Sequence, residues 1–317
     1  MKHEVSFVTP RRVAIIGAGL LGGSFGLAIR QYAAFESSQS GTDSNHEIIG
    51  VSRSASSRDA ALRSGAVTSA TDNVEDACSE ADLVVIAVPV DGIVPMVHRA
   101  AKHCKKDALI IDLGSTKATI VRAIDSDEPA SRMFVGTHPI AGSEKTGADF
   151  ARADLFIGKT VIVTPGLNTP EPLLQRAEGL WRALKSHVIR MSPEQHDQAM
   201  ASVSHVPHIV ASMLAGILKQ DNRADGNSTS DASLVGSGWL DTTRVASGDP
   251  ELWTAICREN AEAIRKEIAS AIDWLQSFSS KLREEDFAGI RMLLAESQAI
   301  RDRVAAMKQR SAAEKAR

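Results

Sequence analysis

The sequence predicts an α/β protein in which a doubly wound parallel sheet is followed by an all-helical C-terminal domain. Two observations lead to this fold class. Short runs rich in β-branched residues alternate with helical stretches up to about residue 165, and no such run recurs after about residue 191. Because 317 residues exceed what one hydrophobic core usually organises, we expect two domains, residues 1–190 and 191–317.

Six apolar runs predict the strands of the first domain. They cover residues 12–17, 47–52, 82–89, 108–114, 133–139 and 160–165. Nearly continuous apolar runs separated by helices are typical of parallel strands that are covered on both faces. The second domain opens with a helix-start signal, because Ser192 can cap a helix whose first residue is Pro193.

The composition excludes several classes of protein. A formal net charge of −3 and 43% hydrophobic residues give no overall attraction to nucleic acid or to an anionic membrane, so we expect neither partner. The three cysteines, Cys78, Cys104 and Cys257, are far apart and suit packing in a reducing compartment. The longest strongly apolar run, LVVIAVPV, is too short to span a bilayer, and we expect a cytoplasmic protein.

A glycine-rich turn follows the first predicted strand. The segment GAGLLGGS contains the pattern G-x-G-x-x-G at Gly17, Gly19 and Gly22, between an apolar strand and an apolar helix. In this context the glycines allow a tight turn, close approach of a pyrophosphate and packing of the helix on the sheet. The helix N-terminus attracts phosphates. The sequence therefore predicts a Rossmann-type dinucleotide-binding domain over residues 1–190. Further cofactor contacts are expected at Leu20, Leu21, Val88 and Pro89.

The end of the second predicted strand indicates which dinucleotide is bound. An NAD enzyme commonly has an acidic residue there for the ribose 2′-hydroxyl, whereas an NADP enzyme needs space and positive charge for a phosphate. Here the strand ends in Ser52, followed by Arg53 and, further on, Arg58. These residues could bind a phosphate through charge-assisted hydrogen bonds. We predict NADP over NAD; the alternative is that SRSASSR is only a polar loop.

Two polar residues follow later strands of the predicted sheet. Ser115 lies in DLGSTK and His138 lies in THPIAGSEKTG. Ligands of open parallel sheets bind at the carboxyl ends of the strands, so both side chains are expected near the nicotinamide. Pro139 restricts the backbone of His138 to extended conformations, and Gly142 then permits a turn. This pattern favours a fixed imidazole over a mobile one.

Five segments, taken in order, carry a resemblance to a known family. They are GAGLLGGS, DLGSTK, THPIAGSEKTG, SHVPH and DTTRVASGDPELW. The chain resembles the prephenate/arogenate dehydrogenase family of tyrosine biosynthesis over nearly its whole length. The resemblance implies NADP-dependent oxidative decarboxylation of a cyclohexadienol, which converts arogenate to tyrosine and/or prephenate to 4-hydroxyphenylpyruvate. A hydride goes to the nicotinamide and the ring carboxylate leaves as carbon dioxide.

The resemblance also assigns roles to residues. His138 resembles the family's catalytic histidine, which takes the proton of the substrate hydroxyl, and Ser115 resembles the serine that holds this hydroxyl. Arg244 resembles the arginine that binds a substrate carboxylate, a task for which a bidentate guanidinium is suited. The resemblance implies further substrate-pocket residues, of which Trp253 closes the pocket: Glu144, Asp241, Trp253, His205 and His208.

His205 and His208 admit a second interpretation. Three residues apart, they would share one helix face and could hold a metal ion. A third ligand is not recognisable, however, and Pro207 disturbs a helix between them. We therefore expect substrate contacts and no metal.

Two other functions remain open at this stage. One is a different Rossmann dehydrogenase of the β-hydroxyacid or imine-reducing type, although residues after 160 show no matching glycine-plus-lysine motif. The other is a non-catalytic NADP-binding sensor, which the joint presence of Ser115, His138 and Arg244 disfavours. The apolar faces of the C-terminal helices favour a homodimer. The strand end typical of NADP enzymes favours arogenate over prephenate, by association within the family.

Overall fold

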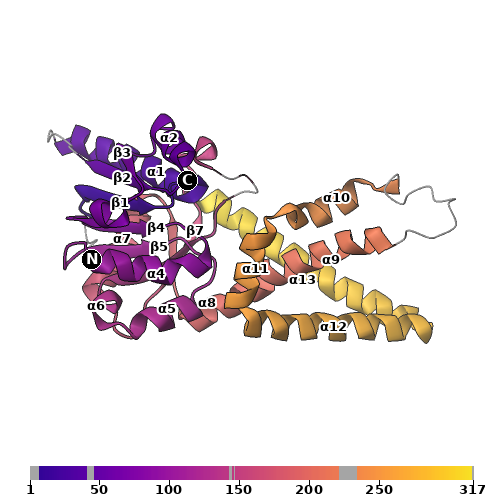
Figure 1. Cartoon of the computed structure of the whole chain (residues 1–317). Coiled ribbons are helices and arrows are strands. Elements are labelled where there is room, and N and C mark those ends of the chain that lie inside the picture. Colours follow the sequence, from indigo (N-terminus) through magenta and orange to yellow (C-terminus); the bar gives the residue numbers. More distant parts are fainter. Residues whose placement is uncertain (1–6, 41–45, 143–144, 146, 221–233, 316–317) are drawn as a thin grey trace. The chain divides into compact units, whose positions relative to one another are not determined.

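The computed structural model describes residues 7–40, 46–142, 145, 147–220 and 234–315 (Figure 1). Contacts divide the chain into a unit that ends at Ala261 and a unit that begins at Glu262. The first unit contains the sheet and all the candidate site residues that the structure describes.

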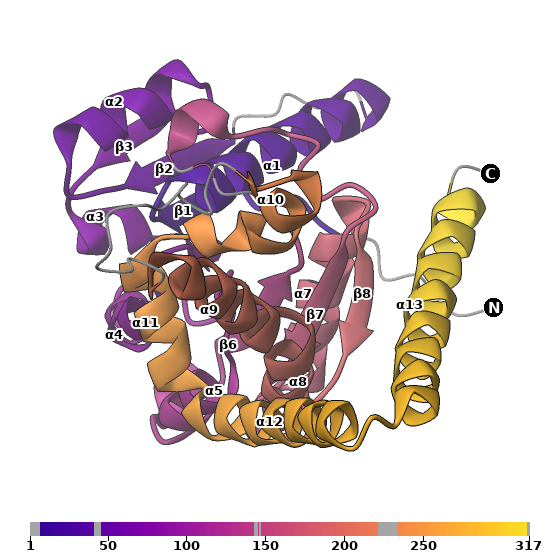
Figure 2. The ribbon, with the colours of Figure 1, turned by 90° about the vertical axis from the view of Figure 1, so that its right-hand side faces the viewer.

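An eight-stranded sheet forms the centre of the first unit, in the order β3-β2-β1-β4-β5-β6-β7-β8. In Figure 2, β3 lies at one end of this sheet and β8 at the other. The strands are β1 (Arg12–Ile16), β2 (Glu47–Val51), β3 (Ser69–Thr71), β4 (Leu83–Ile86), β5 (Leu109–Asp112), β6 (Phe134–Pro139), β7 (Thr160–Thr164) and β8 (His187–Arg190). The expected fold class is confirmed, and all six predicted strands occur.

The sheet differs from the expectation in one pairing. It is mixed, because β7 runs antiparallel to β6, with His138 opposite Ile162. A parallel return requires a long crossover, which is usually a helix. Between β6 and β7 the described residues form only the short turn η1 (Ala148–Phe150), so the chain returns antiparallel. The strands β3 and β8 were not predicted, because their three and four residues carry little apolar pattern.

Helices cover both faces of the sheet. The first seven are α1 (Leu20–Ser40), α2 (Ala55–Arg63), α3 (Val74–Cys78), α4 (Val90–Ala101), α5 (Ala118–Asp125), α6 (Glu128–Ser131) and α7 (Glu171–Ala183). Alternate residues of each strand point to opposite faces. In β1, Val13 and Ile15 pack with α1 and α7, whereas Ala14 and Ile16 pack with α3 and α4.

The chain after β8 is helical, as predicted. It forms α8 (Pro193–Met200), the π-helical turn η2 (Ala201–His205), α9 (Val206–Gln220), α10 (Ser237–Thr243), the turn η4 (Arg244–Ser247) and α11 (Pro250–Glu259). The predicted cap is present, since Ser192 and Gln195 form a reciprocal capping box. The second unit contains α12 (Ala261–Arg283) and α13 (Phe287–Lys315).

Contacts group α8 to α11 with the sheet and not with α12 and α13. Ala255 and Ile256 of α11, for example, belong to the same apolar core as α4 and α5. The expected domain boundary after residue 190 coincides with the end of β8 and stays a prediction.

One helical run, Pro193–Leu218, is long and apolar enough to cross a membrane by length and composition alone. Its window is 28% buried. The helical character of this segment was predicted, but its length as one apolar run was not, because α8, η2 and α9 follow one another without a break. His196, Asp197 and His205 are buried within it and form hydrogen bonds to the rest of the first unit, so the run is part of that folded unit.

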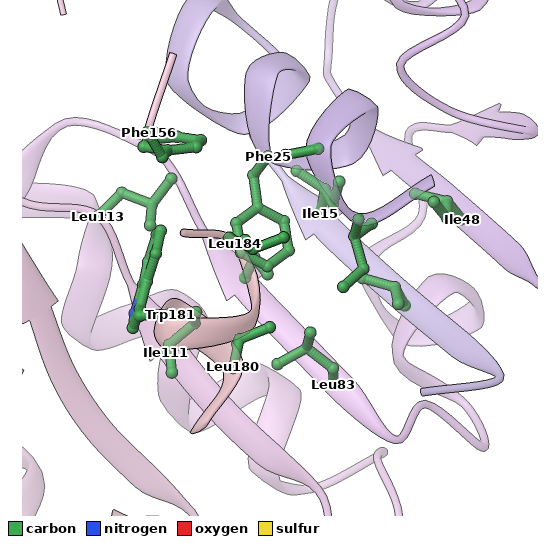
Figure 3. Packing of buried hydrophobic residues seen from close by; sticks show 14 of the residues in the cluster. Ile15, Phe25, Ile48, Leu83, Ile111, Leu113, Phe156, Leu180, Trp181 and Leu184 are labelled. Carbon is green, nitrogen blue, oxygen red and sulfur yellow. The ribbon is translucent and has the colours of Figure 1, made fainter. Parts of the chain in front are cut away.

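Trp181 is the largest fully buried side chain of the core on the α1 and α7 side (Figure 3). Its indole meets the rings of Phe25 and Phe156 edge-on, at centroid distances of 5.6 Å and 5.3 Å. Such pairs add to the stabilisation that area burial provides. Its Nε1 has no hydrogen-bond partner among the described residues.

Trp181→Ala should therefore lower the free energy of unfolding by about 3–5 kcal/mol, because it leaves a large cavity. Trp181→Phe should cost less, since it keeps an aromatic ring and removes the unpaired N–H. Urea unfolding followed by far-ultraviolet circular dichroism measures both. Equal losses for the two variants would contradict this account of the core.

Candidate active site

The glycine-rich turn between β1 and α1 has the shape that a dinucleotide phosphate requires. Gly17 has φ of 95°, and a Cβ there would collide with the backbone oxygen of Ala87. A Cβ on Gly22 would collide with the backbone oxygen of Gly17, whereas one on Gly19 would meet nothing within 4 Å. The space next to Gly19 is therefore open, at the N-terminus of a helix of 21 residues.

This turn forms part of a cavity of about 540 Å³. Of the residues predicted to contact the cofactor, Gly17, Gly19, Ser52, Val88 and Pro89 line this cavity. Leu20 and Leu21 open α1 beside it. The size, the open space at Gly19 and the helix N-terminus fit the pyrophosphate and adenosine of a dinucleotide.

A second cavity, of about 490 Å³, lies between residues 7–11 and α7, next to Asp82 and Asp107. These residues precede β1, β4 and β5, so this cavity lies at the amino ends of the strands. The glycine turn and the groups described below lie at the carboxyl ends, where ligands of such sheets bind.

We call the cavity next to Gly19 the cofactor cavity. The two arginines expected to bind a phosphate do not line it. Arg58 donates from Nη1 to the backbone oxygens of Ser52 at 2.8 Å and Arg53 at 3.0 Å, and it lies 3.6 Å from Asp72. Arg53 is exposed. Among the described residues, the cation in the cavity wall is Arg63, with Ser56 and Ser57 on the same helix.

A buried ion pair lies where β5 ends. Lys117 and Asp112 both have fully buried side chains, and Nζ is 2.6 Å from Oδ2. Nζ also donates to the backbone oxygens of Gly114 and Thr116 at 2.8 Å and 2.9 Å. The other carboxylate oxygen of Asp112 accepts from the backbone N of Thr137 at 3.0 Å. The pair thus fixes the loop that carries Ser115 to the strand that carries His138.

Asp197 of α8 binds the N-terminus of α5. Its carboxylate accepts from the backbone N–H groups of Lys117 at 2.8 Å and Ala118 at 2.9 Å. Residue Lys117 is the N-cap of α5 and makes no side-chain cap bond of its own. A carboxylate at this place satisfies free N–H groups and interacts favourably with the helix dipole. It also ties α8 to the sheet.

Asp197, His196 and His138 form a hydrogen-bonded chain. His196 Nδ1 is 2.7 Å from Asp197 Oδ1, and His196 Nε2 is 2.8 Å from His138 Nδ1. The carboxylate only accepts, so His196 carries its proton on Nδ1 and accepts at Nε2. His138 must then donate from Nδ1. Its Nε2 is left as an unprotonated acceptor, which is the form a general base requires.

The surroundings keep these histidines neutral. Burial lowers the pKa of His138 well below its ordinary value, and the charges of His196, Lys117 and His205 lower it further. Burial also lowers the pKa of His196, an effect that the hydrogen bond and charge of Asp197 oppose. The pKa of His205 falls to about 4, mainly through burial.

Trp253 brings His205 and His208 together. Its ring stacks on His208, at a centroid distance of 3.5 Å and 11° between planes, and meets His205 edge-on at 6.1 Å. Asn260 connects this cluster to the first, because its Nδ2 donates to the backbone oxygen of Asp197 at 2.8 Å and lies 3.1 Å from His205 Nδ1. Nδ1 of His205 thus has a protein partner, whereas Nδ1 of His208 is buried without one among the described residues. The described residues contain no group of three His, Cys, Asp or Glu side chains that could hold a metal ion.

The other expected site residues lie outside these networks. Ser115 is half-buried in the loop between Asp112 and Lys117. Arg244 and Asp241 are exposed, and among the described contacts no bond joins them to the histidine chain. The turn η4, which starts at Arg244, is followed by Gly248, where a Cβ would collide with Trp253. Glu144 lies outside the described residues.

Sequence analysis missed the four residues that hold His138 and the Ser115 loop in place: Asp112, Lys117, His196 and Asp197. It also missed Asn260 and Arg63. Two signals were available. Asp112 and Lys117 belong to DLGSTK, where a buried charge at a strand end requires a partner. The adjacent His196 and Asp197 occur in the first turns of a helix whose start was recognised. What the sequence does not give is that the two segments meet.

Comparisons with known proteins identify the family. A model described as the prephenate dehydrogenase nucleotide-binding domain matches residues 39–190, and one described as its dimerization domain matches residues 192–296. The chain is 32% identical over 278 residues to the prephenate dehydrogenase of Bacillus subtilis, which covers 86% of this chain and 71% of the relative. It is 31% identical over 276 residues to the cyclohexadienyl dehydrogenase of Zymomonas mobilis, which covers 87% and 90%.

Solved structures agree. The prephenate dehydrogenase of Aquifex aeolicus, in complex with hydroxyphenyl propionate and NAD+, superposes with a TM-score of 0.83 at 29% identity, over 94% of this chain and 99% of that one. The arogenate dehydrogenase of Synechocystis gives 0.74 at 26% identity, over 92% and 99%. The chain therefore belongs to the prephenate dehydrogenase family and is an oxidoreductase that uses a pyridine nucleotide.

Proposed function

We propose that this enzyme catalyses the NADP-dependent oxidative decarboxylation of arogenate to tyrosine, prephenate being the second candidate substrate, with His138 as the base. The observation that carries the proposal is the chain from Asp197 through His196 to His138, at the same sheet edge as the dinucleotide cavity. A neutral imidazole with a fixed acceptor nitrogen suits removal of a hydroxyl proton.

The protein residues have separate tasks in this reaction. When bound, the nicotinamide supplies the hydride acceptor. His138 Nε2 accepts the proton of the ring hydroxyl as that carbon is oxidised, while Ser115 holds the same oxygen. Arg244 binds a substrate carboxylate, and Trp253, with His205 and His208 against it, closes the pocket. Glu144 and Asp241 belong to its entrance.

Orientation and proton transfer together supply most of the catalysis. Loss of carbon dioxide leaves an aromatic ring, so the reaction itself is strongly favourable. Holding the reacting carbon against its acceptor can supply roughly 7–11 kcal/mol of the barrier. General base catalysis adds about 10²- to 10⁴-fold. The hydrogen bonds that fix His138 and the Ser115 loop serve the first of these contributions.

Two features support NADP. Ser52 stands where an NAD enzyme commonly has an acidic residue, and the cavity next to it contains a cation and hydroxyl groups. The Aquifex aeolicus structure contains NAD+, so the preference has to be measured. The choice between arogenate and prephenate follows only by association with NADP, and relatives are named for each substrate.

The assembly and the compartment also remain proposals. The matched C-terminal model is described as a dimerization domain, which supports a homodimer. Exposed apolar side chains on α12 and α13 fit such an interface, for example Leu275, Phe287 and Met292. The cytoplasm, and the lack of nucleic-acid, membrane and metal partners, stay predictions from composition.

The first test offers arogenate and prephenate separately, each with NADP and with NAD, and follows reduced-nicotinamide absorbance. We expect the highest kcat/KM for arogenate with NADP. Higher kcat/KM with NAD would contradict the cofactor proposal alone, and higher kcat/KM with prephenate would reverse the order of substrates. No rise in reduced-nicotinamide absorbance in any of the four mixtures, with folded protein, would contradict the proposed reaction.

His138→Asn removes the base but keeps a side chain of similar polarity. We expect kcat to fall by about 10²- to 10⁴-fold with little change in KM. His187→Asn is the matched control, because His187 is exposed on β8 and should leave kcat unchanged. An unaltered kcat in His138→Asn would show that another group takes the proton.

The pH profile tests the state of the base. Only neutral His138 can accept a proton, and its pKa is held well below the ordinary histidine value. Activity should therefore persist as the pH falls past about 6.5, the pKa of an unperturbed histidine, and decline only at more acidic pH, where His138 becomes protonated. The measurement is kcat between pH 4.5 and 9. An acidic limb centred at or above the ordinary pKa would contradict the assignment.

Asp197→Asn tests the tautomer of the chain. The amide NH₂ can donate to His196 Nδ1, which reverses every donor and leaves His138 Nε2 protonated. We expect kcat to fall by about 10²- to 10⁴-fold, as when a triad histidine adopts the wrong tautomer, with little change in KM. The thermal midpoint should fall as well, because an amide nitrogen facing His196 cannot accept from the backbone N–H of Lys117. A purely structural role would lower the thermal midpoint and leave kcat of the folded fraction intact.

A further inference from the structure

The cofactor cavity contains a cation that the sequence did not single out. We propose that Arg63 recognises the ribose 2′-phosphate of NADP and that Asp149, across the cavity, is its counter-ion when no phosphate is present. The inference rests on the proposed NADP preference and names the residue responsible for it.

Arg63 lies on the face of α2 that lines the cavity. Ser56, Ala60 and Arg63 are four and three residues apart, which places them along one side of a helix, and all three line the cavity. Side chains of a helix tilt towards its N-terminus. This tilt favours a reach of the long Arg63 side chain along the cavity wall, which Ser56 and Ser57 also line at the end of α2 that follows β2 and Ser52.

The opposite wall comes from the connection between β6 and β7. Figures 1 and 2 both show the pink turn of residues 148–150 beside α2. Arg63 Nη2 is 3.9 Å from Asp149 Oδ1, with the side chains 66% and 67% exposed. The turn is anchored, since Ala148 is buried and the backbone N of Arg152 donates to Ser24 Oγ at 2.9 Å.

The other candidate cations have different places. The Arg58 guanidinium binds the backbone oxygens of Ser52 and Arg53 and lies close to Asp72. Arg53 is exposed and is not among the described residues that line the cavity. Among the described residues, Arg63 is thus the cation that lines the same cavity as the serines, and Arg58 instead fixes the backbone at the end of β2.

The partner of Arg63 can be displaced. An ion pair this exposed contributes little to stability, because water screens it and both side chains lose freedom. A phosphate dianion offers more charge and more acceptor oxygens than a carboxylate, and Ser56 and Ser57 add hydroxyl donors. With a 2′-hydroxyl in place of the phosphate, Arg63 keeps its pairing with Asp149 and contributes nothing specific.

The two residues should therefore have opposite effects on NADP. Arg63→Gln should weaken binding of NADPH by about tenfold to a hundredfold, the loss of one charged hydrogen-bonding partner, and leave NADH unchanged. Asp149→Asn should strengthen binding of NADPH several-fold, because it removes a competing carboxylate. The measurement is titration of nicotinamide fluorescence with NADPH and NADH, independent of turnover.

Calorimetry measures the affinities for 2′,5′-ADP and 5′-AMP, which both lack the nicotinamide and differ by the 2′-phosphate. Their difference therefore gives the contribution of this phosphate alone. Arg63→Gln should weaken 2′,5′-ADP alone. Arg132→Gln is the matched control, because Arg132 has the same 66% side-chain exposure and a similar exposed partner in Glu128. Arg132 precedes β6, at the amino ends of the strands, and does not line the cavity. It should change neither affinity.

Failure of this inference is distinct from failure of the cofactor proposal. If the unmodified enzyme binds NADH as tightly as NADPH, both the proposed NADP preference and the proposed role of Arg63 are contradicted. If the enzyme prefers NADPH but Arg63→Gln keeps the same ratio, only the inference is overturned. A loss of preference in Arg53→Gln instead would place the phosphate at the strand end. Weaker NADH binding in Asp149→Asn would indicate that Asp149 accepts a hydrogen bond from a ribose hydroxyl. That result would also overturn the inference.

Discussion

The buried ion pair between Asp112 and Lys117 is the interaction on which the reacting end of the molecule depends. Two charges with no exposed side-chain surface are stable only because each is paired and hydrogen-bonded further. Removing one partner of such a pair costs about 3–5 kcal/mol, since it leaves an uncompensated charge. The pair connects β5, the loop of Ser115 and β6, and Lys117 also offers its backbone N–H to Asp197. One constraint thus orients groups from three segments.

The fold class could be read from the sequence because its signals are local. Apolar runs, a glycine pattern and a helix cap each lie within a few residues, and the strands, the turn at Gly17 and the cap at Ser192 occur where they were predicted. The antiparallel return of β7 could not be read, because it depends on what the chain does between two strands.

The site was only partly predictable for the same reason. His138 and Ser115 were found from their places at strand ends, whereas His196 lies 58 residues from His138 and meets it only through tertiary packing. Asp197 is a polar residue in the first turns of a helix, and no local sequence pattern marks it. Its function depends on the free N–H groups of α5, which no local pattern joins to it. Arg58 was expected to bind phosphate, but its backbone partners are fixed by the turn after β2.

The charges around His138 explain how a half-buried histidine could act as the proposed base in each cycle. Burial and the ammonium of Lys117 disfavour the imidazolium, so the resting ring is neutral and ready to accept a proton. The same burial and positive charge raise the free energy of protonated His138, which favours release of the proton after hydride transfer. Asp197 limits this cost, because its carboxylate lies two hydrogen bonds away through His196 and attracts the positive charge. A histidine that was buried but had no carboxylate nearby would accept the proton poorly. A histidine that had the carboxylate but was not buried would release the proton poorly. The combination allows both steps with one side chain.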